Sequence, residues 1–330
     1  MKHLHLLIPD LFLPRDVSPQ VYGGLSLPAL EKLLARSVCT TLPAMQVEEF
    51  LCDHFSAESV APVRAAADGL NVSAGFWLCA DPVHLQLQQS QVVLQPDVQC
   101  TAGEAAELCA TLNVHFADDG LLFHAPHPQR WYMRCAEPSI VTMTPLRVAA
   151  WRDVKVCQPQ GEDALRWQRV ANEIQMLLHG HAVNQSREAR GGPAINSLWL
   201  WGGGCASALH PDFDAVGGDD ALSAACARAT GIAGVASLHA LLSGKGENGL
   251  WVCALPSAAW QRGDLYAWRE AVAVIERDIA QSVLQAMQSG CLRTVTLEVL
   301  SEPATSRFEL SRAGLWKVWR PKRTLAHYAV

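Results

Sequence analysis

The chain has 330 residues, of which 50% are hydrophobic and 18% are charged, and its formal net charge is −6. This composition excludes an intrinsically disordered chain. The length allows one large domain or two domains of ordinary size. The acidic balance disfavours a nucleic-acid partner. No stretch approaches the roughly 20 apolar residues of a membrane span, so we expect no membrane partner either.

The cysteines and the first residues bear on the compartment. There are 11 cysteines, an odd number with no Cys-x-x-Cys pair, which is typical of neither a disulfide framework nor a zinc ribbon. The opening stretch MKHLHLLIPDLFLP contains a short apolar run without a cleavage site. We therefore expect a cytoplasmic protein with free thiols, which begins with a strand rather than a signal peptide.

In chain order, the first predicted element is a strand at 3–8, followed by a helix at 27–36 with leucines on one face. Residues 43–56 predict another helix, and residues 66–75 read as a turn-rich boundary.

Between residues 76 and 156 the sequence pattern changes and predicts short strands separated by turns that contain Pro, Gly and Asp. Within this block, Thr101 and Glu104 have the spacing of a capping box, which predicts a helix reaching about Leu112. Short strands are predicted around Val92, Leu121 and Val141. The block is therefore expected to form a separate α+β unit.

The second half predicts an amphipathic helix at 164–179 and a long helix at 265–287. Strands are predicted at 194–204, 249–255 and 294–299. Alternation of strands with helices favours an α/β fold with a mainly parallel sheet flanked by helices.

The stretch AINSLWLWGGG at 194–204 is predicted to be a central strand buried on both faces. Gly202, Gly203 and Gly204 follow it, at the end of the strand where open α/β sheets bind ligands. The alternative is a tight turn without a ligand. The run lacks the lysine and the spacing of a phosphate-binding P-loop.

Charged residues cluster just before this strand. Asn184, Arg187 and Arg190 could form a clamp for a phosphate or carboxylate, with the backbone amides of Gly202–Gly204 completing an anion cradle. The basic residues of the chain comprise 20 Arg and 6 Lys, and Arg suits fixed anion contacts. The alternative is a solvated loop whose arginines pair with acidic neighbours such as Glu188.

A second polar and aromatic cluster includes Trp131 and Arg134, which could close the cradle from the α+β unit. Packing of a small domain by Trp131 is the simpler alternative.

The close histidine pairs, His124 with His127 and His179 with His181, have no Cys or carboxylate at metal-ligand spacing. Roles as turn-capping or surface histidines are favoured for them over metal binding. A Gly-x-Ser-x-Gly elbow is absent, which disfavours a serine hydrolase.

The stretch HAVNQSREARGGPAINSLWLWGGG resembles a segment of the archaeal-type, cofactor-independent phosphoglycerate mutases. Weaker likeness extends over most of the chain, at 80–85, 101–113, 132–134, 144–147 and 273–278. The resemblance implies a core like that of alkaline phosphatase, formed by 1–71 and 158–330. It also implies an inserted substrate-binding α+β domain at 72–157.

That superfamily holds two divalent metals with Asp and His ligands and uses a Ser or Thr nucleophile. Here the expected Pro-Asp-Glu-x-Gly-His reads Pro256-Ser-Ala-Ala-Trp260, and the expected Asp-His reads Ser301-Glu302. No Gly-Ser-Asp nucleophile motif occurs, and Asp10 alone stands where the first metal-binding Asp would be. A two-metal site needs several hard ligands for each ion, so we predict neither a metal nor another cofactor.

A closer resemblance, over nearly the full length, is to a bacterial group labelled regulatory proteins of the pathogenicity-factor E type, or phosphoglycerate-mutase-like. It rests on motifs such as LHLLIPDLF, APHPQRWYMR and INSLWLWGGG. The resemblance implies a regulatory role. Because the arginine clamp and the central strand are present while the metal ligands are missing, we expect a metal-free pseudoenzyme that binds a small phosphorylated or carboxylate ligand, or a protein partner.

Two alternatives stay open. One is an active mutase or phosphatase with an atypical site built from Asp10, His124, His127 and Glu302. The other is a purely structural interaction protein.

Overall fold

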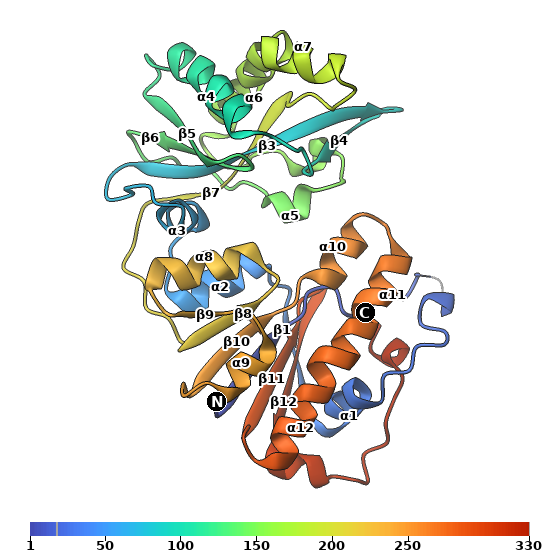
Figure 1. Cartoon of the computed structure of the whole chain (residues 1–330). Coiled ribbons are helices and arrows are strands. Elements are labelled where there is room, and N and C mark those ends of the chain that lie inside the picture. The colour runs from blue at the N-terminus through green and yellow to red at the C-terminus, as the bar shows by residue number, and fades with distance from the viewer. Residues whose placement is uncertain (18, 330) are drawn as a thin grey trace. The chain divides into compact units, whose positions relative to one another are not determined.

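A computed structural model of the chain describes residues 1–17 and 19–329 and divides into two compact units. Met1–Phe55 together with His210–Val330 form the first unit, and Ser56–Leu209 form the second. Figure 1 shows the elements of each unit in the colours of the chain order. Each unit has its own sheet and its own hydrophobic core.

The first unit contains a seven-stranded sheet in the order β2-β12-β11-β1-β10-β8-β9. Its strands are β1 (His3–Leu7), β2 (Val38–Pro43), β8 (Ala215–Gly218), β9 (Ala233–Val235), β10 (Asn248–Val252), β11 (Thr294–Val299) and β12 (Ala304–Ser311). The neighbours from β11 to β9 are parallel, whereas β12 is antiparallel to both β11 and β2. The prediction of a mainly parallel sheet is therefore confirmed for this unit.

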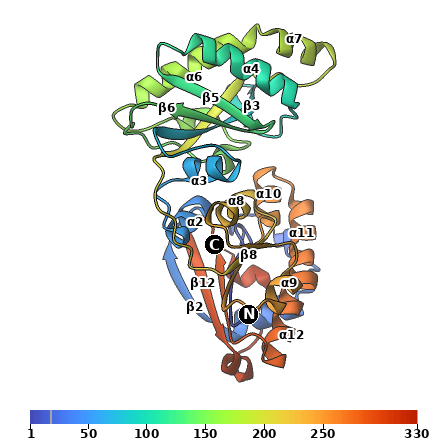
Figure 2. The ribbon, with the colours of Figure 1, turned by 60° about the vertical axis from the view of Figure 1, so that its left-hand side comes forward.

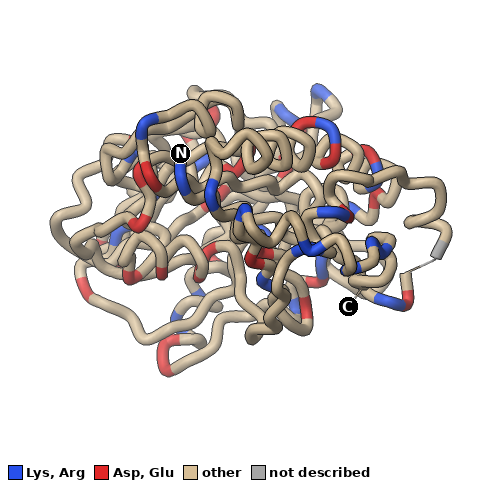
Figure 3. Tube along the Cα trace, turned by 90° about the horizontal axis from the view of Figure 1, so that it is seen from below, with Lys and Arg blue, Asp and Glu red and all other residues tan. Residues whose placement is uncertain are grey.

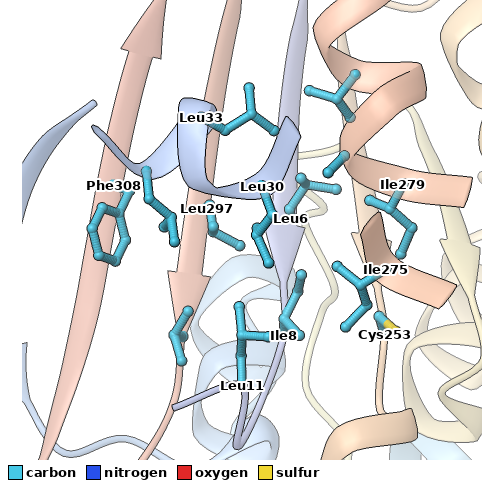
Figure 4. Packing of buried hydrophobic residues seen from close by; sticks show 14 of the residues in the cluster. Leu6, Ile8, Leu11, Leu30, Leu33, Cys253, Ile275, Ile279, Leu297 and Phe308 are labelled. Atoms are coloured by element: carbon cyan, nitrogen blue, oxygen red, sulfur yellow. The ribbon is translucent and has the colours of Figure 1, made fainter. Parts of the chain in front are cut away.

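Helices pack on this sheet. They are α1 (Pro28–Arg36), α2 (Val47–Phe55), α8 (Ala221–Thr230), α9 (Leu238–Ser243), α10 (Leu255–Gln261), α11 (Leu265–Val274) and α12 (Gln281–Ser289). A π-helical turn at Ile275–Ala280 joins α11 to α12, so the long helix predicted at 265–287 is continuous. Figure 4 shows Leu6 of β1, and Ile8 just after the end of β1, packed among Leu30 of α1 and Ile275.

The π-helical turn also caps the N-terminus of α1. Leu27, the N-cap residue of α1, provides no side-chain cap. Instead, the buried carboxylate of Glu276 accepts hydrogen bonds from the backbone N–H groups of Ala29 at 2.9 Å and Leu30 at 2.8 Å. These N–H groups would otherwise lack helical partners, so a residue almost 250 positions away caps α1.

The second unit is built on an antiparallel sheet. Its strands are β3 (Phe76–Gln88), β4 (Gln91–Gln95), β5 (Leu121–His127), β6 (Arg130–Cys135) and β7 (Ser197–Gly204), and its helices are α3 (Val60–Ala67), α4 (Ala102–His115), α5 (Leu146–Ala149), α6 (Ala164–His179) and α7 (Ala182–Ala189). Figures 1 and 2 show α4 and α6 on one face of this sheet and α3 on the other.

The strand predicted at 194–204 forms as β7, but its predicted place as a central strand of the parallel sheet is wrong. β7 pairs antiparallel with β3 in the second sheet, and its other edge pairs with no strand of the described residues. Leu198 and Leu200 pack in the core with α6, and Trp201 is also buried. A run of apolar residues indicates that both faces of a strand are buried. Here helices cover both faces of β7, although it is an edge strand.

The division of the chain differs from the ranges expected from the sequence. Residues 158–209, expected in the core, lie in the second unit because β7 pairs with β3 and α6 packs against β7. Residues 56–71 lie there too, since α3 packs against β3 and β7.

Several local predictions can be compared with the structure. The helix at 164–179 and the strand at 294–299 form with the predicted bounds, and the capping box of α4 has both of its hydrogen bonds. Val141 lies outside the described strands, where only a bridge between Thr142 and Gln160 occurs. All 11 cysteines are free thiols. In the described part of the chain, the helices are all too short or too polar to cross a membrane.

Candidate functional site

Asn184 of the predicted clamp is a buried structural residue. Its side-chain amide donates to the carbonyls of Leu178 at 2.7 Å and Ile195 at 2.9 Å, and its oxygen accepts from the N–H of Ile195 at 2.8 Å. The side chain therefore joins the end of α6 to the segment that enters β7. These bonds use its oxygen and both amide protons.

Arg187 and Arg190 do converge, as predicted, but they converge on Glu104. Arg187 Nη1 lies 3.0 Å from Glu104 Oε2, and Arg190 Nη2 lies 2.9 Å from Glu104 Oε1. Arg187 Nε also donates to the carbonyl of Pro193. The anion held by these two guanidinium groups is thus the carboxylate that also closes the capping box of α4.

The electrostatics of this cluster favour the ionised carboxylate. Burial acts to raise the pKa of Glu104, but hydrogen bonds from Thr101 and the charge of Arg187 outweigh it, so the pKa is lowered. Figure 3 shows that residues of both charge signs are scattered along the chain. An external anion would compete with Glu104 for these arginines.

Gly202–Gly204 are the last residues of β7 rather than a loop after it. A Cβ atom on Gly203 would lie 2.6 Å from Leu78 Cδ2 and 2.9 Å from Phe76 Cζ, and one on Gly204 would collide with Ser59 Oγ. The glycines therefore permit close packing against β3 and the start of α3. The clamp precedes β7 and the glycines end it, so about 20 Å of extended strand separates them.

Trp131 and Arg134 point to opposite faces of β6. Trp131 is buried in the core of the second unit, and its indole N–H donates to the carbonyl of Pro128 at 2.7 Å. Arg134 is exposed, with its aliphatic part close to Gly75. Residues at odd spacing on a strand face opposite ways, so one small ligand does not reach both.

The residues of the alternative catalytic site are divided between the units. Asp10 and Glu302 belong to the first unit, and His124 and His127 belong to the second. His124 stacks on Trp77, and burial together with the charge of Arg134 lowers its pKa. His127 Nδ1 accepts from the N–H of Gln129, which is the turn-capping role favoured from the sequence.

His181 also has a capping role. Its Nδ1 accepts from the N–H of Val183 at the start of α7, and its Nε2 lies 2.9 Å from Thr111 Oγ1.

The donor set at the carboxyl ends of the parallel strands does not fit the two metal ions that the family resemblance implies. Asp219 Oδ1 accepts from the N–H of Ala254 at 2.6 Å, and Asp220 caps α8 through the N–H of Ser223. Ser257 stands where the family motif has its Asp, and Trp260, where the motif has a glycine, packs against the core. Within residues 1–17 and 19–329, no group of three or more His, Cys, Asp or Glu side chains is arranged to hold a metal ion.

Sequence reasoning missed a buried ion-pair network on the α3 face of the second sheet. Arg64 of α3 binds both carboxylate oxygens of Asp81 at 2.7 Å, and the indole N–H of Trp201 donates to the same carboxylate at 2.9 Å. The Arg64 guanidinium also lies over the rings of Tyr132 and Trp201. Burial acts to lower the pKa of Arg64, but the charge of Asp81 outweighs it and raises the pKa.

A second pair extends this network. Asp68, at the end of α3, accepts two hydrogen bonds from Arg130 and one from the hydroxyl of Tyr132 at 2.7 Å. These bonds outweigh burial and lower the pKa of Asp68. The pairs fasten α3 to β3, β6 and β7, and the spacing of these residues in the sequence carries no signal for them.

A pocket of about 170 Å³ in the second unit was also missed. It lies between α6, β7 and the segment around residues 143–159. Its residues come from distant parts of the chain, so no local motif marks it.

The fold and these sites define a two-unit α/β protein with a mainly parallel sheet and a separate antiparallel sheet. No protein-family model and no curated protein matches the chain in sequence.

Solved structures are similar to it over most of its length. The PH0037 protein from Pyrococcus horikoshii is 11% identical, with a TM-score of 0.56 over 94% of this chain and 87% of that one. The cofactor-independent phosphoglycerate mutase from Thermoplasma acidophilum is 12% identical, with a TM-score of 0.48 over 94% of this chain and 90% of that one. The first likeness shows a shared fold.

Proposed function

We propose that this chain is a non-catalytic regulatory protein with a phosphoglycerate-mutase-like fold, and that it acts by binding a small molecule or a protein partner. The proposal rests mainly on the hydrogen bonds of the acidic side chains that follow the carboxyl ends of the parallel strands. Asp219 and Asp220 accept hydrogen bonds from backbone N–H groups in the loops and helix that follow. They therefore support the local backbone rather than an array of metal ligands.

Two further observations support the proposal. The sequence resembles phosphoglycerate mutases while Ser257 and Trp260 replace residues of the metal-binding motif. The arginines suited to holding a phosphate, Arg187 and Arg190, are paired with Glu104. Without metal ions or a free cationic clamp, phosphoryl transfer would have no stabilisation for its developing charge.

The experiment is a comparison of the wild-type chain with Asp10→Asn. Both proteins are loaded with Mn²⁺ or Zn²⁺, desalted, and analysed for bound metal, then assayed with 3-phosphoglycerate and with p-nitrophenyl phosphate. We expect both proteins to retain no stoichiometric metal and to show the same background turnover.

Two tightly bound ions for each wild-type chain, with turnover that Asp10→Asn abolishes, would establish the active-mutase alternative. The binding role is measured separately by thermal unfolding with added metabolites. A ligand that binds only the folded chain adds about 2.7 kcal/mol to its stability at 100 times its Kd. A purely structural protein would show no such shift with any small molecule.

A further inference from the structure

The pocket beside α6 carries no formal charge on any of the side chains that line it. Its walls include Trp167, Trp199 and Leu198, and its polar groups are amides and hydroxyls such as those of Gln168 and Thr144. An ion that entered would lose its hydration without gaining a partner of opposite charge. The pocket therefore selects an uncharged ligand.

One wall of the pocket is the unpaired edge of β7. Four consecutive residues, Ser197–Leu200, line it. Consecutive side chains of a strand point to opposite faces, so a pocket that contacts all four runs along the edge of the strand. β3 occupies one edge of β7, and no strand of the described chain pairs with the other. That second edge offers backbone N–H and C=O groups to a ligand.

The facing wall is a row of amides on α6. Gln168, Asn172 and Gln175 are spaced by four and three residues, which places them on one side of the helix. Among the described residues, none forms a hydrogen bond with the side-chain amide of any of the three. Each amide offers both donors and an acceptor. The two walls together present both donors and acceptors.

The pocket is held in shape by its own contacts. The indole N–H of Trp199 donates to the carbonyl of Thr144 at 2.9 Å, which ties the 143–159 segment to β7. Trp167, fully buried, donates to Ser139 Oγ at 2.7 Å. The volume of about 170 Å³ is close to that of an engineered cavity of about 150 Å³ that binds benzene. It therefore has room for one six-membered ring.

We infer that this pocket binds an uncharged, planar, single-ring molecule with hydrogen-bonding groups on its edge, of the kind represented by a pyrimidine base or an aromatic amide. The ring lies against the apolar and indole walls, and its polar edge pairs with the amides of α6 and the free edge of β7. The inference rests on the small-molecule role proposed above and names its site and ligand class.

The experiment measures binding of four probes to the full chain by calorimetry and by ligand-observed NMR. Uracil and nicotinamide are neutral rings with a polar edge, orotate is the uracil ring with an added carboxylate, and toluene is a ring without polar groups. Compounds of this size bind with a Kd of about 1 mM when the site fits them. We expect uracil, nicotinamide or both to bind in that range, and orotate and toluene to bind at least about tenfold more weakly.

The variants are Gln168→Leu with Asn172→Leu, and Gln285→Leu as a matched control on the exposed face of α12 in the first unit. Each lost hydrogen bond should weaken binding about fivefold, and the control should leave it unchanged. The inference is overturned if neither neutral probe binds by about 10 mM, if orotate binds as well as uracil, or if the double variant binds like the control. Metal content and turnover are measured independently, so this result and that of the proposed function are distinguishable.

Discussion

Arg187 Nη1 lies 3.0 Å from Glu104 Oε2, and this ion pair joins α7 to the first turn of α4. Both side chains are largely buried, at 7% and 13% exposed. The sequence pattern suggested that Arg187 and Arg190 bind an external anion. In the structure, the carboxylate of Glu104 from the same unit takes that place.

Replacing Glu104 by Gln should destabilise the second unit by about 3 kcal/mol, because it leaves the buried guanidinium of Arg187 without its counter-charge. The measurement is urea unfolding followed by circular dichroism. Asp278→Asn is the control, since its pair with Arg277 is exposed on both sides and should change stability by less than about 1 kcal/mol. Equal effects of the two substitutions would show that the Glu104–Arg187 pair contributes no more to stability than an exposed ion pair.

The anion-binding prediction made from the sequence can be tested with the same variant. Glu104→Gln frees two guanidinium groups, so 3-phosphoglycerate should raise the melting temperature of this variant more than that of the wild type. Adding Arg187→Ala should remove the gain. If the wild type already binds 3-phosphoglycerate and Arg187→Ala weakens that binding, the clamp binds external anions despite Glu104.

Gly203→Ala should destabilise the protein by about 1–3 kcal/mol, because the new methyl group has no room against Leu78 and Phe76. Gly103→Ala is the matched control in α4, where a Cβ meets nothing within 4 Å and should stabilise the helix by about 0.5–1 kcal/mol. Thermal unfolding measures both. A neutral Gly203→Ala would contradict the close-packing role of the glycine run.

Asp81→Asn should cost about 3–5 kcal/mol, since it leaves Arg64 charged and buried with no carboxylate. Asp118→Asn removes an exposed carboxylate from the same unit and should change stability by less than about 0.5 kcal/mol. Urea unfolding of the two variants gives the comparison. A small effect at Asp81 would mean that the α3 network contributes little to the second unit.

The stability of the first unit should depend on pH through His5, whose Nε2 lies 3.2 Å from Glu298 Oε1. Burial lowers the pKa of His5, and this outweighs the opposing effect of Glu298, while His54 and Arg307 act with burial. The folded state therefore binds the proton less readily than the unfolded state. The stability that His5 contributes is complete above its unfolded pKa, about 6.5, and is lost as the pH falls towards the lower folded value.

Urea midpoints between about pH 8 and pH 5 test this prediction. His5→Gln should flatten the fall in stability below about pH 6.5, whereas His239→Gln, which removes an exposed histidine of α9, should keep the wild-type profile. An unchanged profile in His5→Gln would show that other groups produce the pH dependence.

The sequence by itself determined the features that depend on neighbours along the chain. The apolar stripe of α6, the capping box of Thr101 and Glu104, and the parallel β11 were predictable because helix periodicity and capping need only residues a few positions apart. The same local signals predicted that Arg187 and Arg190 would converge.

The tertiary structure alone decided what those elements meet. Glu104, 83 positions from Arg187, occupies the clamp, and Glu276, 247 positions from Ala29, caps α1. β7 pairs with β3 rather than with the parallel sheet. Burial patterns state that a residue is covered but not by which partner. The partner is chosen by packing and ion pairing between distant segments, which only the folded chain brings together.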